Sequence, residues 1–519
     1  MKNHPAPGHA KAIALLGTGS DVGKSVLAAG LCRLLRRAGY SVAPFKAQNM
    51  SLNSFVTPEG GEIGRAQALQ AEACGIPPHV DMNPILLKPE SDTCCQVIVH
   101  GKVQAKLEAA AYFRTGLPLF EAVRTSYERL AVRHDVIVIE GAGSAAEVNL
   151  RDRDLVNWPA VRLAHAKVLL VADIDRGGIF AQLIGTLELV QKEERDRVIG
   201  LLINKFRGDR ALFEDGVTFI EKRTGIPVVG VVPFLRELQL DQEDSLPLGM
   251  QRSAPFDATR VNVAVVLLPH MSNFTDFNAL VNESDVAVRY TSSPGDLCAA
   301  DVVIIPGTKS TVADLRYMVE RQLCEAIHTH VRRGGELVGI CGGYQMLGRR
   351  IDDPDGVEAG GGAAGLGLLD VSTLLRREKT TTLVEGMALH IECPSVLRIR
   401  GYHIHMGETS RGRDGAAFHL THVSGHEPEQ PDSRQRSEPR LDGAVRPDGL
   451  VWGTYIHGLF DAPGFRRTWL NRVRQRKALP PLDVGISESA TVQRDGELDR
   501  WADHLRQHIN LEPIWAALR

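Results

Sequence analysis

The chain has 519 residues, of which 43% are hydrophobic and 24% are charged. These values are typical of globular proteins, so they exclude a wholly disordered chain and leave enough material for at least two folded domains. The 60 Lys and Arg residues nearly balance the 63 Asp and Glu residues, for a formal net charge of −3, which gives no overall electrostatic attraction to nucleic acid or to an anionic membrane.

Short apolar runs alternate with amphipathic stretches in the first half of the chain. A helix is expected over about residues 24–38, and strands are expected over residues 12–16, 136–139, 168–171, 199–203 and 228–231. Unbroken runs of Val, Ile and Leu indicate strands that are covered on both faces, as in the parallel sheets of α/β proteins. Residues 239–257 are polar and contain proline, which is typical of a linker.

A second α/β unit is predicted after this linker. Strands are expected over residues 261–268, 302–305 and 337–340, with a helical stretch over residues 312–333. Residues 424–447 are rich in proline and charge and are expected to form a surface insertion or a disordered loop. The tail looks helical after about residue 487. The predicted division is a first domain over 1–240, a linker over 241–258, a second domain over 259–480 and a tail over 481–519. The tail has four apolar side chains that can dock against a folded domain, namely Trp501, Leu505, Ile509 and Trp515.

The sequence GTGSDVGKS, residues 17–25, lies between a predicted strand and a predicted helix. Backbone N–H groups of such a turn, with those at the start of the helix, can surround phosphate oxygens. Lys24 would then reach the β- and γ-phosphates of a nucleotide, and the Ser25 hydroxyl would bind Mg²⁺. The motif is not strict, because Thr18 stands where its first glycine is expected. An ordinary glycine-rich turn is the alternative.

Two further residues are predicted to belong to this site. Glu140 ends the strand over residues 136–139, where a carboxylate can bind Mg²⁺ directly or through water; a loop or helix-capping acid is the alternative. Lys46 follows the apolar run SVAPF and could add positive charge at the transferred phosphate, whereas a solvated lysine is its alternative. The predicted ATP-binding residues are Thr18, Gly19, Gly23, Lys24, Ser25 and Lys46, and the predicted metal ligands are Ser25 and Glu140.

The sequence GICGG, residues 339–343, follows a predicted strand and precedes the predicted helix YQMLG. Small residues on both sides of Cys341 allow a tight turn that presents a nucleophile, and the following helix N-terminus can form an oxyanion hole. His457 in GTYIHGLFD is the expected base, because a thiolate–imidazole pair is the minimum for covalent acyl transfer. Gly342, and Gly307 in PGTKS, are the expected oxyanion positions. His405 in GYHIHMG could also face the site.

Taken together, these motifs resemble those of the cobyric acid synthase family of glutamine-dependent amidotransferases. The resemblance runs from about residue 13 to about residue 460. It rests on GTGSDVGKS, PFKAQNMSLNS, EIGRAQALQAEACG, MNPILLKP, IEGAGSAAEVNL, DIDRGGIFAQLIGT, SNFTDF, PGTKST, GICGGYQMLG, GYHIHMG and GTYIHGLFD, in the order of the family. The phosphate loop or the cysteine turn alone would not be so specific.

The resemblance implies an α/β fold with an N-terminal P-loop NTPase-like domain, similar to dethiobiotin synthetase, and a C-terminal class I glutamine amidotransferase domain. It implies ATP- and glutamine-dependent amidation of carboxylates b, d, e and g of the corrinoid adenosylcobyrinic acid a,c-diamide, with Cys341 as nucleophile and His457 as base. ATP and Mg²⁺ are then required, and no prosthetic group is expected. Ammonia made at one site must reach the other, so an internal path across the domain interface is expected.

One position departs from better-known class I amidotransferases, which carry a glutamate two residues after the histidine. Here that position is Leu459, and the cobyric acid synthase family is similar in lacking the glutamate. Asp461 or Glu408 could orient His457 instead, and the sequence does not decide between them. We therefore expect a Cys341–His457 dyad.

Two other functions are consistent with parts of the sequence. Cobyrinic acid a,c-diamide synthase shares both domain types, but the stretches QNMSLNS and EIGRAQALQAEACG favour cobyric acid synthase. A partition-type regulatory ATPase would account for the first half of the chain and would need no cysteine turn. A test for glutaminase activity separates this ATPase from an amidotransferase.

Cysteine spacing and the distribution of apolar residues bear on location. The eight cysteines have no zinc-binding spacing, no run of 18 apolar residues occurs, and the first apolar run is too short for a signal peptide. We therefore expect a soluble cytoplasmic protein whose partners are the corrinoid, glutamine and ATP, without nucleic acid or membrane. The oligomeric state is not indicated.

Overall fold

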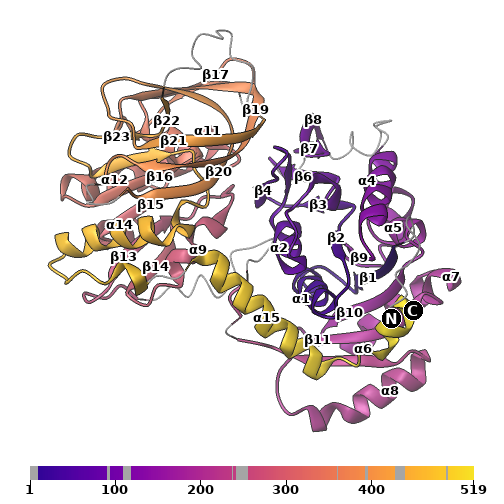
Figure 1. Ribbon diagram of the computed structural model, residues 1–519. Helices are drawn as coiled ribbons and strands as arrows, with labels where there is room; N and C mark the ends of the chain where they lie inside the picture. Colours follow the sequence, from indigo (N-terminus) through magenta and orange to yellow (C-terminus); the bar gives the residue numbers. More distant parts are fainter. Residues whose placement is uncertain are drawn as a thin grey trace.

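The computed structural model describes residues 10–90, 94–108, 119–236, 238–240, 255–358, 360–391, 396–426, 439–486 and 489–519. The chain forms two α/β lobes, each built on its own six-stranded sheet, as Figure 1 shows. We call residues 10–240 the N-terminal lobe and residues 255–486 the C-terminal lobe. Within the described ranges, no helix is both long enough and apolar enough to cross a membrane.

The central sheet of the N-terminal lobe is entirely parallel, in the order β12-β11-β10-β1-β9-β2. Its strands are β1 (Lys11–Gly17), β2 (Val42–Phe45), β9 (Val136–Glu140), β10 (Lys167–Asp173), β11 (Val198–Phe206) and β12 (Val228–Pro233). The five strands predicted from apolar runs are confirmed, because the sheet is buried on both faces: Leu15 packs into one core and Leu16 into the other. The helices of this lobe are α1 (Lys24–Arg37), α2 (Arg65–Cys74), α4 (Leu119–Arg133), α5 (Trp158–Leu163), α6 (Ile179–Leu189), α7 (Lys192–Arg195) and α8 (Glu214–Thr224).

Two smaller sheets of this lobe were not expected from the sequence. One has the order β3-β6-β7-β8, with β3 (Gln48–Met50), β6 (Ile85–Pro89), β7 (Cys94–Val99) and β8 (Lys102–Glu108); the other pairs β4 (Ser54–Val56) with β5 (Glu62–Gly64). Several of these strands have only three residues, which is too short for a recognisable periodicity. The backbone of β4 contacts the C-terminal lobe: the Ser54 N–H donates to Oδ1 of Asn273 at 3.0 Å.

The central sheet of the C-terminal lobe has the order β14-β13-β15-β16-β24-β23, parallel except for the last pair. Its strands are β13 (Val261–Val266), β14 (Val286–Thr291), β15 (Val302–Ile305), β16 (Glu336–Ile340), β23 (Ala444–Val445) and β24 (Val451–Thr454). The helices of this lobe are α9 (Asn278–Val281), α10 (Pro294–Ala299), α11 (Thr311–Glu320), α12 (Leu323–Arg332), α13 (Gly342–Leu347) and α14 (Pro463–Arg476). The single helical stretch predicted over 312–333 is wrong, because Gln322 adopts a left-handed backbone (φ 60°) that separates α11 from α12.

A third large sheet extends the C-terminal lobe. Its strands are β17 (Arg350–Asp353), β18 (Gly361–Ala364), β19 (Val371–Ala388), β20 (Arg398–Arg411), β21 (Phe418–His426) and β22 (Arg440–Asp442). Residues 427–438 lie outside the described residues. Of the two alternatives for residues 424–447, the disordered loop is wrong for the part that the structure describes, because β22 and β23 are strands. Asp442 is buried there because its carboxylate accepts hydrogen bonds from the Thr454 hydroxyl and the Tyr455 N–H.

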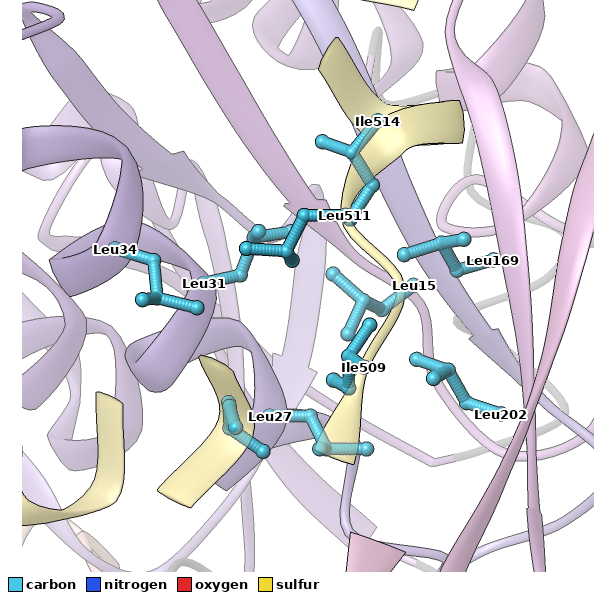
Figure 2. A pocket seen from close by; sticks show the side chains of 10 residues that line it. Leu15, Leu27, Leu31, Leu34, Leu169, Leu202, Ile509, Leu511 and Ile514 are labelled. Atoms are coloured by element: carbon cyan, nitrogen blue, oxygen red, sulfur yellow. The ribbon is translucent and has the colours of Figure 1, made fainter. Parts of the chain in front are cut away.

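The tail returns to the N-terminal lobe. Figure 1 shows α15 (Ala490–His508) running from the C-terminal lobe to the N-terminal lobe, where α16 (Glu512–Leu518) ends the chain. The predicted docking is confirmed, since Trp501, Leu505, Ile509 and Trp515 all belong to or pack against the core beside α1. In Figure 2, Ile509, Leu511 and Ile514 of the tail face leucines of α1 and of the central sheet, and these side chains leave only about 10 Å³ of free space.

Candidate active sites

The glycine-rich loop between β1 and α1 forms the first candidate site. Gly23 has a left-handed backbone (φ 96°) directly before α1, which glycine adopts without strain. Lys24 is buried, and its Nζ donates to the carbonyl oxygens of Gly19 (2.8 Å) and Gly143 (3.0 Å). Thr18 donates from its backbone N–H to the Val171 carbonyl at 2.9 Å. The loop therefore curves around the ammonium group of Lys24, as a phosphate-binding loop does.

Glu140 gathers four side chains at the end of β9. Its Oε1 accepts hydrogen bonds from Ser25 Oγ (2.7 Å) and Lys46 Nζ (2.9 Å), and its Oε2 accepts from the amide groups of Gln70 (2.5 Å) and Gln67 (3.2 Å). Burial alone would raise the pKa of Glu140, but the charge of Lys46 and these hydrogen bonds hold that pKa below its usual value. Glu140 is therefore ionised at neutral pH, and Lys46 is a buried partner of it rather than a solvated surface lysine.

Ser25 and Glu140 supply hydroxyl and carboxylate oxygens, which are the ligands that Mg²⁺ prefers. Among the residues that the structure describes, no group of three or more His, Cys, Asp or Glu side chains could hold a metal ion. Mg²⁺ commonly keeps several waters and binds through one or two protein groups together with phosphate oxygens. The two oxygen donors beside the phosphate loop therefore fit a nucleotide-bound Mg²⁺ ion.

A cavity of about 1230 Å³ opens beside the phosphate loop. Both lobes line it, with Lys24, Lys46 and Glu140 from the N-terminal lobe and Leu267, Leu268, Pro269, Met271 and Phe274 from the C-terminal lobe. Trp501 of the tail also contributes to the wall. Pockets for single small ligands are commonly 300–1,000 Å³, so this cavity has room for a nucleotide and part of a second ligand.

The second candidate site is the turn between β16 and α13. Cys341 lies in this turn with φ 51° and ψ −110°, a backbone conformation that is strained for a residue with a side chain. The turn is tightly packed, because a Cβ on Gly343 would lie 2.0 Å from the Ile305 carbonyl oxygen. The Cys341 thiol donates to the Ile404 carbonyl oxygen at 3.5 Å. Strained turns of this kind present a nucleophile at the edge of a parallel sheet.

His457 follows β24 and is held by a carboxylate. Its Nδ1 lies 2.7 Å from Oδ2 of Asp276, whose Oδ1 accepts from the Gly458 N–H at 2.9 Å. Both side chains are at least 96% buried. Burial alone would lower the pKa of His457, but Asp276 and Cys341 together raise it to about 10. With Nδ1 bonded to Asp276, the other ring nitrogen is left for Cys341, so the three side chains form a Cys–His–Asp arrangement.

The expectation of a Cys341–His457 dyad is wrong, because Asp276 is buried against the imidazole. The two candidate orienting residues that the sequence left open pair elsewhere. Glu408 is exposed and pairs with Arg376 at 3.1 Å, and Asp461 pairs with Arg494 at 3.0 Å. Asp276 lies in the stretch SNFTDF, so the motif was recognised in the sequence but its carboxylate was not.

The two predicted oxyanion glycines lie next to this arrangement. Gly342 begins α13, and the first N–H groups of a helix have no acceptor within the helix. A Cβ on Gly342 would lie 3.2 Å from the Thr308 backbone nitrogen, and a Cβ on Gly307 would lie 3.0 Å from Cε1 of His457. The turns after β15 and β16 therefore meet at Cys341 and His457, where backbone N–H groups can stabilise an oxyanion.

His405 also lies near His457, as the sequence suggested. Its ring stacks on Tyr455 with centroids 3.8 Å apart, and its Nδ1 lies 2.8 Å from the Gly407 carbonyl oxygen. Burial, with the nearby His457 charge, lowers the pKa of His405 to about 4. His405 is therefore neutral at pH 7 and forms part of the wall around the site.

Comparisons with known proteins cover both lobes. A family described as a CobB/CobQ-like glutamine amidotransferase domain matches residues 262–465, and one described as a CobQ/CobB/MinD/ParA nucleotide binding domain matches residues 13–248. The cobyric acid synthases of Syntrophobacter fumaroxidans and Citrobacter koseri are each 47% identical to this chain, over 517 and 516 residues. That of Dehalococcoides mccartyi is 45% identical over 514 residues. Each alignment covers 98% of this chain and 98% of the relative.

Proposed function

The chain belongs to the cobyric acid synthase family, and from that membership we propose that it amidates carboxylates b, d, e and g of adenosylcobyrinic acid a,c-diamide. It is a glutamine-dependent amidoligase of cobalamin biosynthesis that uses ATP. The observation that best supports the proposed reaction is the presence, in one chain, of a phosphate loop beside Glu140 and a Cys341–His457–Asp276 arrangement.

Glutamine is the proposed source of ammonia. The Cys341 sulfur attacks the carboxamide carbon, and the backbone around Gly342 and Gly307 stabilises the resulting oxyanion. His457 donates a proton to the departing ammonia, while Asp276 holds the imidazole in the required tautomer. Water then cleaves the thioester to glutamate and restores the thiol. Each turnover therefore releases one ammonia molecule inside the protein.

The N-terminal lobe is the proposed site of carboxylate activation. A carboxylate has no good leaving group, so its oxygen first accepts the γ-phosphoryl group of ATP, and ammonia then displaces phosphate from the acyl phosphate. We assign phosphate binding to the backbone of Gly19 and Gly23, and charge stabilisation to Lys24 and Lys46. The predicted phosphate contact of the Thr18 backbone is not assigned, because its N–H already donates to the Val171 carbonyl oxygen at 2.9 Å. Mg²⁺ held by Ser25 and Glu140 would supply further positive charge to the phosphate oxygens.

Ammonia must pass from one lobe to the other without becoming protonated in solvent. The cavity extends from Lys24 and Glu140 to Met271 and Phe274, in the stretch that leads to Asp276. We propose that ammonia enters this cavity from the side of Cys341 and His457. We therefore propose an ATP-binding domain over residues 1–240, a linker over 241–258, a glutaminase domain over 259–480 and a tail over 481–519. The partition-type ATPase does not account for Cys341 and His457, and the full-length relatives favour cobyric acid synthase over the a,c-diamide synthase.

Product analysis tests the proposed reaction. The purified chain is incubated with adenosylcobyrinic acid a,c-diamide, ATP, Mg²⁺ and glutamine, and the added amides are counted by mass spectrometry. Four added amides per corrinoid support the proposal. Amidation of cobyrinic acid at positions a and c, with none on the a,c-diamide, would instead identify the a,c-diamide synthase.

A further inference from the structure

Residues 48–56 of the N-terminal lobe, which we call the bridging segment, lie between the two candidate sites. The segment contains β3 and β4 and the turn that joins them. At its first end, Asn49 Nδ2 donates to Gln67 Oε1 at 2.9 Å, and Gln67 Nε2 donates to Glu140 at 3.2 Å. The bridging segment is therefore hydrogen-bonded, through one glutamine, to the carboxylate of the phosphate site.

The other end of the segment makes a reciprocal contact with the C-terminal lobe. Oδ1 of Asn53 accepts from the Phe274 N–H at 3.1 Å, and Oδ1 of Asn273 accepts from the Ser54 N–H at 3.0 Å. Asn53 and Asn273 are each only 2% exposed. Because a buried N–H without an acceptor is costly, each lobe supplies the side chain that satisfies the backbone of the other.

Asn273 also begins the short helix that carries Asp276. It adopts a left-handed backbone (φ 52°) directly before the 3₁₀ helix Phe274–Phe277, and its carbonyl oxygen accepts from the Asp276 N–H at 3.0 Å. Asp276 in turn bonds to His457. The hydrogen bonds made by Asn53 and Asn273 thus fix the start of the 3₁₀ helix that contains Asp276, the carboxylate bonded to His457.

The bridging segment also contacts Tyr402, whose ring stacks on His457 with centroids 5.4 Å apart. The Tyr402 hydroxyl donates to the Ser54 carbonyl oxygen at 3.4 Å, and the Phe55 ring meets Tyr402 edge-on at 5.1 Å. Asp276, which bonds to Nδ1 of the imidazole, and Tyr402, which stacks on the face of the ring, are therefore both held by residues 53–55.

We propose that Asn53 and Asn273 are positioning residues for glutamine hydrolysis, so that the ATP-binding lobe completes the glutaminase site of the C-terminal lobe. The inference rests on the proposed function. A shift of the bridging segment when Glu140 and its neighbours engage nucleotide would change the placement of Asp276 and Tyr402 about His457. Glutamine is then hydrolysed fastest when the carboxylate-activating site is loaded.

The test uses substitutions that remove the side-chain oxygen of Asn53 or of Asn273 and keep the backbone conformation. Asn53→Ala removes the acceptor of the Phe274 N–H. Asn273→Gly removes the acceptor of the Ser54 N–H but still allows positive φ. Asn471→Ala is the matched control, because Asn471 also makes two hydrogen bonds to backbone, both to Leu482, but away from either site.

Glutamine hydrolysis is measured with and without ATP and the a,c-diamide, beside ammonia-driven amidation. For Asn53→Ala and Asn273→Gly we expect kcat for glutamine to fall about tenfold or more with KM little changed, because the base is misplaced rather than the binding site lost. The stimulation by ATP and corrinoid should shrink as well. Ammonia-driven amidation should stay within about twofold of wild type, and Asn471→Ala should resemble wild type.

The pH profile provides a readout that a general loss of structure would not change. The groups facing His457 are Asp276, Cys341, Tyr402, His403 and His405. Loosening Asp276 removes the charge that raises the pKa of His457, so the alkaline limb of kcat/KM for glutamine should move to lower pH in Asn53→Ala and Asn273→Gly.

Three results would overturn the inference: an unchanged glutaminase rate and pH profile, an equal fall in ammonia-driven amidation, or an equal fall in the glutaminase rate of Asn471→Ala. Failure of the proposed function is recognised separately. In that case the wild-type chain itself forms no amide on the a,c-diamide with either glutamine or ammonia. A working wild type with unaffected variants contradicts only the positioning roles of Asn53 and Asn273.

Discussion

Glu140 and Asp276 are buried carboxylates, and each holds a basic side chain in place. Glu140 pairs with Lys46, and Asp276 pairs with His457. Both pairs lie near the carboxyl edge of a parallel sheet, where the ends of neighbouring strands converge. Removing one member of a buried pair leaves an uncompensated charge, so the loss of either carboxylate should affect its partner directly.

Asp276→Asn keeps the shape of the side chain and removes its charge. We expect glutamine hydrolysis to fall by at least about tenfold, or about 1.4 kcal/mol, because the imidazole loses its orienting carboxylate. The pKa of His457 should fall from about 10, so the alkaline limb of the pH profile should move to lower pH. Ammonia-driven amidation should persist. Asp461→Asn is the control, and an equal loss there would refute the role of Asp276.

Lys24→Ala removes the ammonium group from the phosphate loop. Loss of a group that stabilises transition-state charge commonly costs about 10²–10³ in rate, or about 3–4 kcal/mol. Glutamine-driven and ammonia-driven amidation should fall together, because both need the activated carboxylate. Rates of product formation with each nitrogen source provide the measurement. Retained ammonia-driven turnover would show that this loop does not serve carboxylate activation.

Local motifs could be read from the sequence, and long-range partners could not. Lys24, Ser25 and Cys341 stand in short patterns whose spacing already specifies a turn and a chemistry. Asp276 lies 181 residues before His457, and no spacing rule connects them. The sequence therefore singled out Cys341 and His457 but not Asp276, the carboxylate that bonds to His457 within the same lobe.

At the scale of single elements, α15 is docked through a close contact with α1. A Cβ on Gly30 of α1 would lie 2.3 Å from Cδ1 of Leu505 and 2.6 Å from Nε1 of Trp501. That indole cannot move away freely, because Nε1 donates to the Val26 carbonyl oxygen at 2.7 Å. Gly30 is therefore required by the close approach of the two helices.

Two glycine-to-alanine substitutions should have opposite effects on stability. Gly30→Ala should destabilise the protein by about 1–3 kcal/mol, because the added methyl group overpacks the contact with Leu505 and Trp501. Gly496→Ala, in α15 with open space around it, should stabilise it by about 0.5–1 kcal/mol through helix propensity. Thermal unfolding of both variants beside wild type is the measurement. Stabilisation by Gly30→Ala would mean that α15 does not dock there.

Elements with strong apolar runs were predicted well, and mixed-polarity strands were not. The predicted strands of both central sheets are buried and are rich in Val, Ile and Leu. In the central sheet of the C-terminal lobe, β14, β23 and β24 were not predicted, because their sequences are VAVRYT, AV and VWGT. The long strands β19 and β20 carry polar and charged residues on an exposed face. Neither of them was predicted over its full length, and the break at Gln322 depends on a backbone conformation that composition does not reveal.

At the scale of the whole molecule, ion pairs join the two lobes and the tail. Arg494 of α15 pairs with Glu72 of α2 at 3.1 Å and with Asp461, close after His457, at 3.0 Å. Lys309 pairs with Glu90 across the lobes at 2.7 Å. These contacts join the two lobes around the shared cavity, which Lys24 and Glu140 line from one lobe and Met271 and Phe274 line from the other.

Arg494→Met should loosen this assembly, because two partly buried carboxylates lose their cation. We expect a cost of about 1–2 kcal/mol to the docking of α15, seen as faster hydrogen exchange in α15 and α2. Arg500→Met is the control, since Arg500 pairs within its own helix with Glu497 at 3.3 Å. Equal exchange in both variants would show that Arg494 does not join the lobes.

Isotope tracing tests most directly the central claim, that one chain makes ammonia at Cys341 and passes it internally to an activated carboxylate. The chain is given glutamine labelled with ¹⁵N in its amide, with ATP, Mg²⁺ and the a,c-diamide, in a medium that contains unlabelled ammonium. The account predicts cobyric acid with ¹⁵N in all four new amides and no dilution by the medium. Product that carries mostly unlabelled nitrogen, while Cys341 is intact and glutamine is consumed, would contradict it.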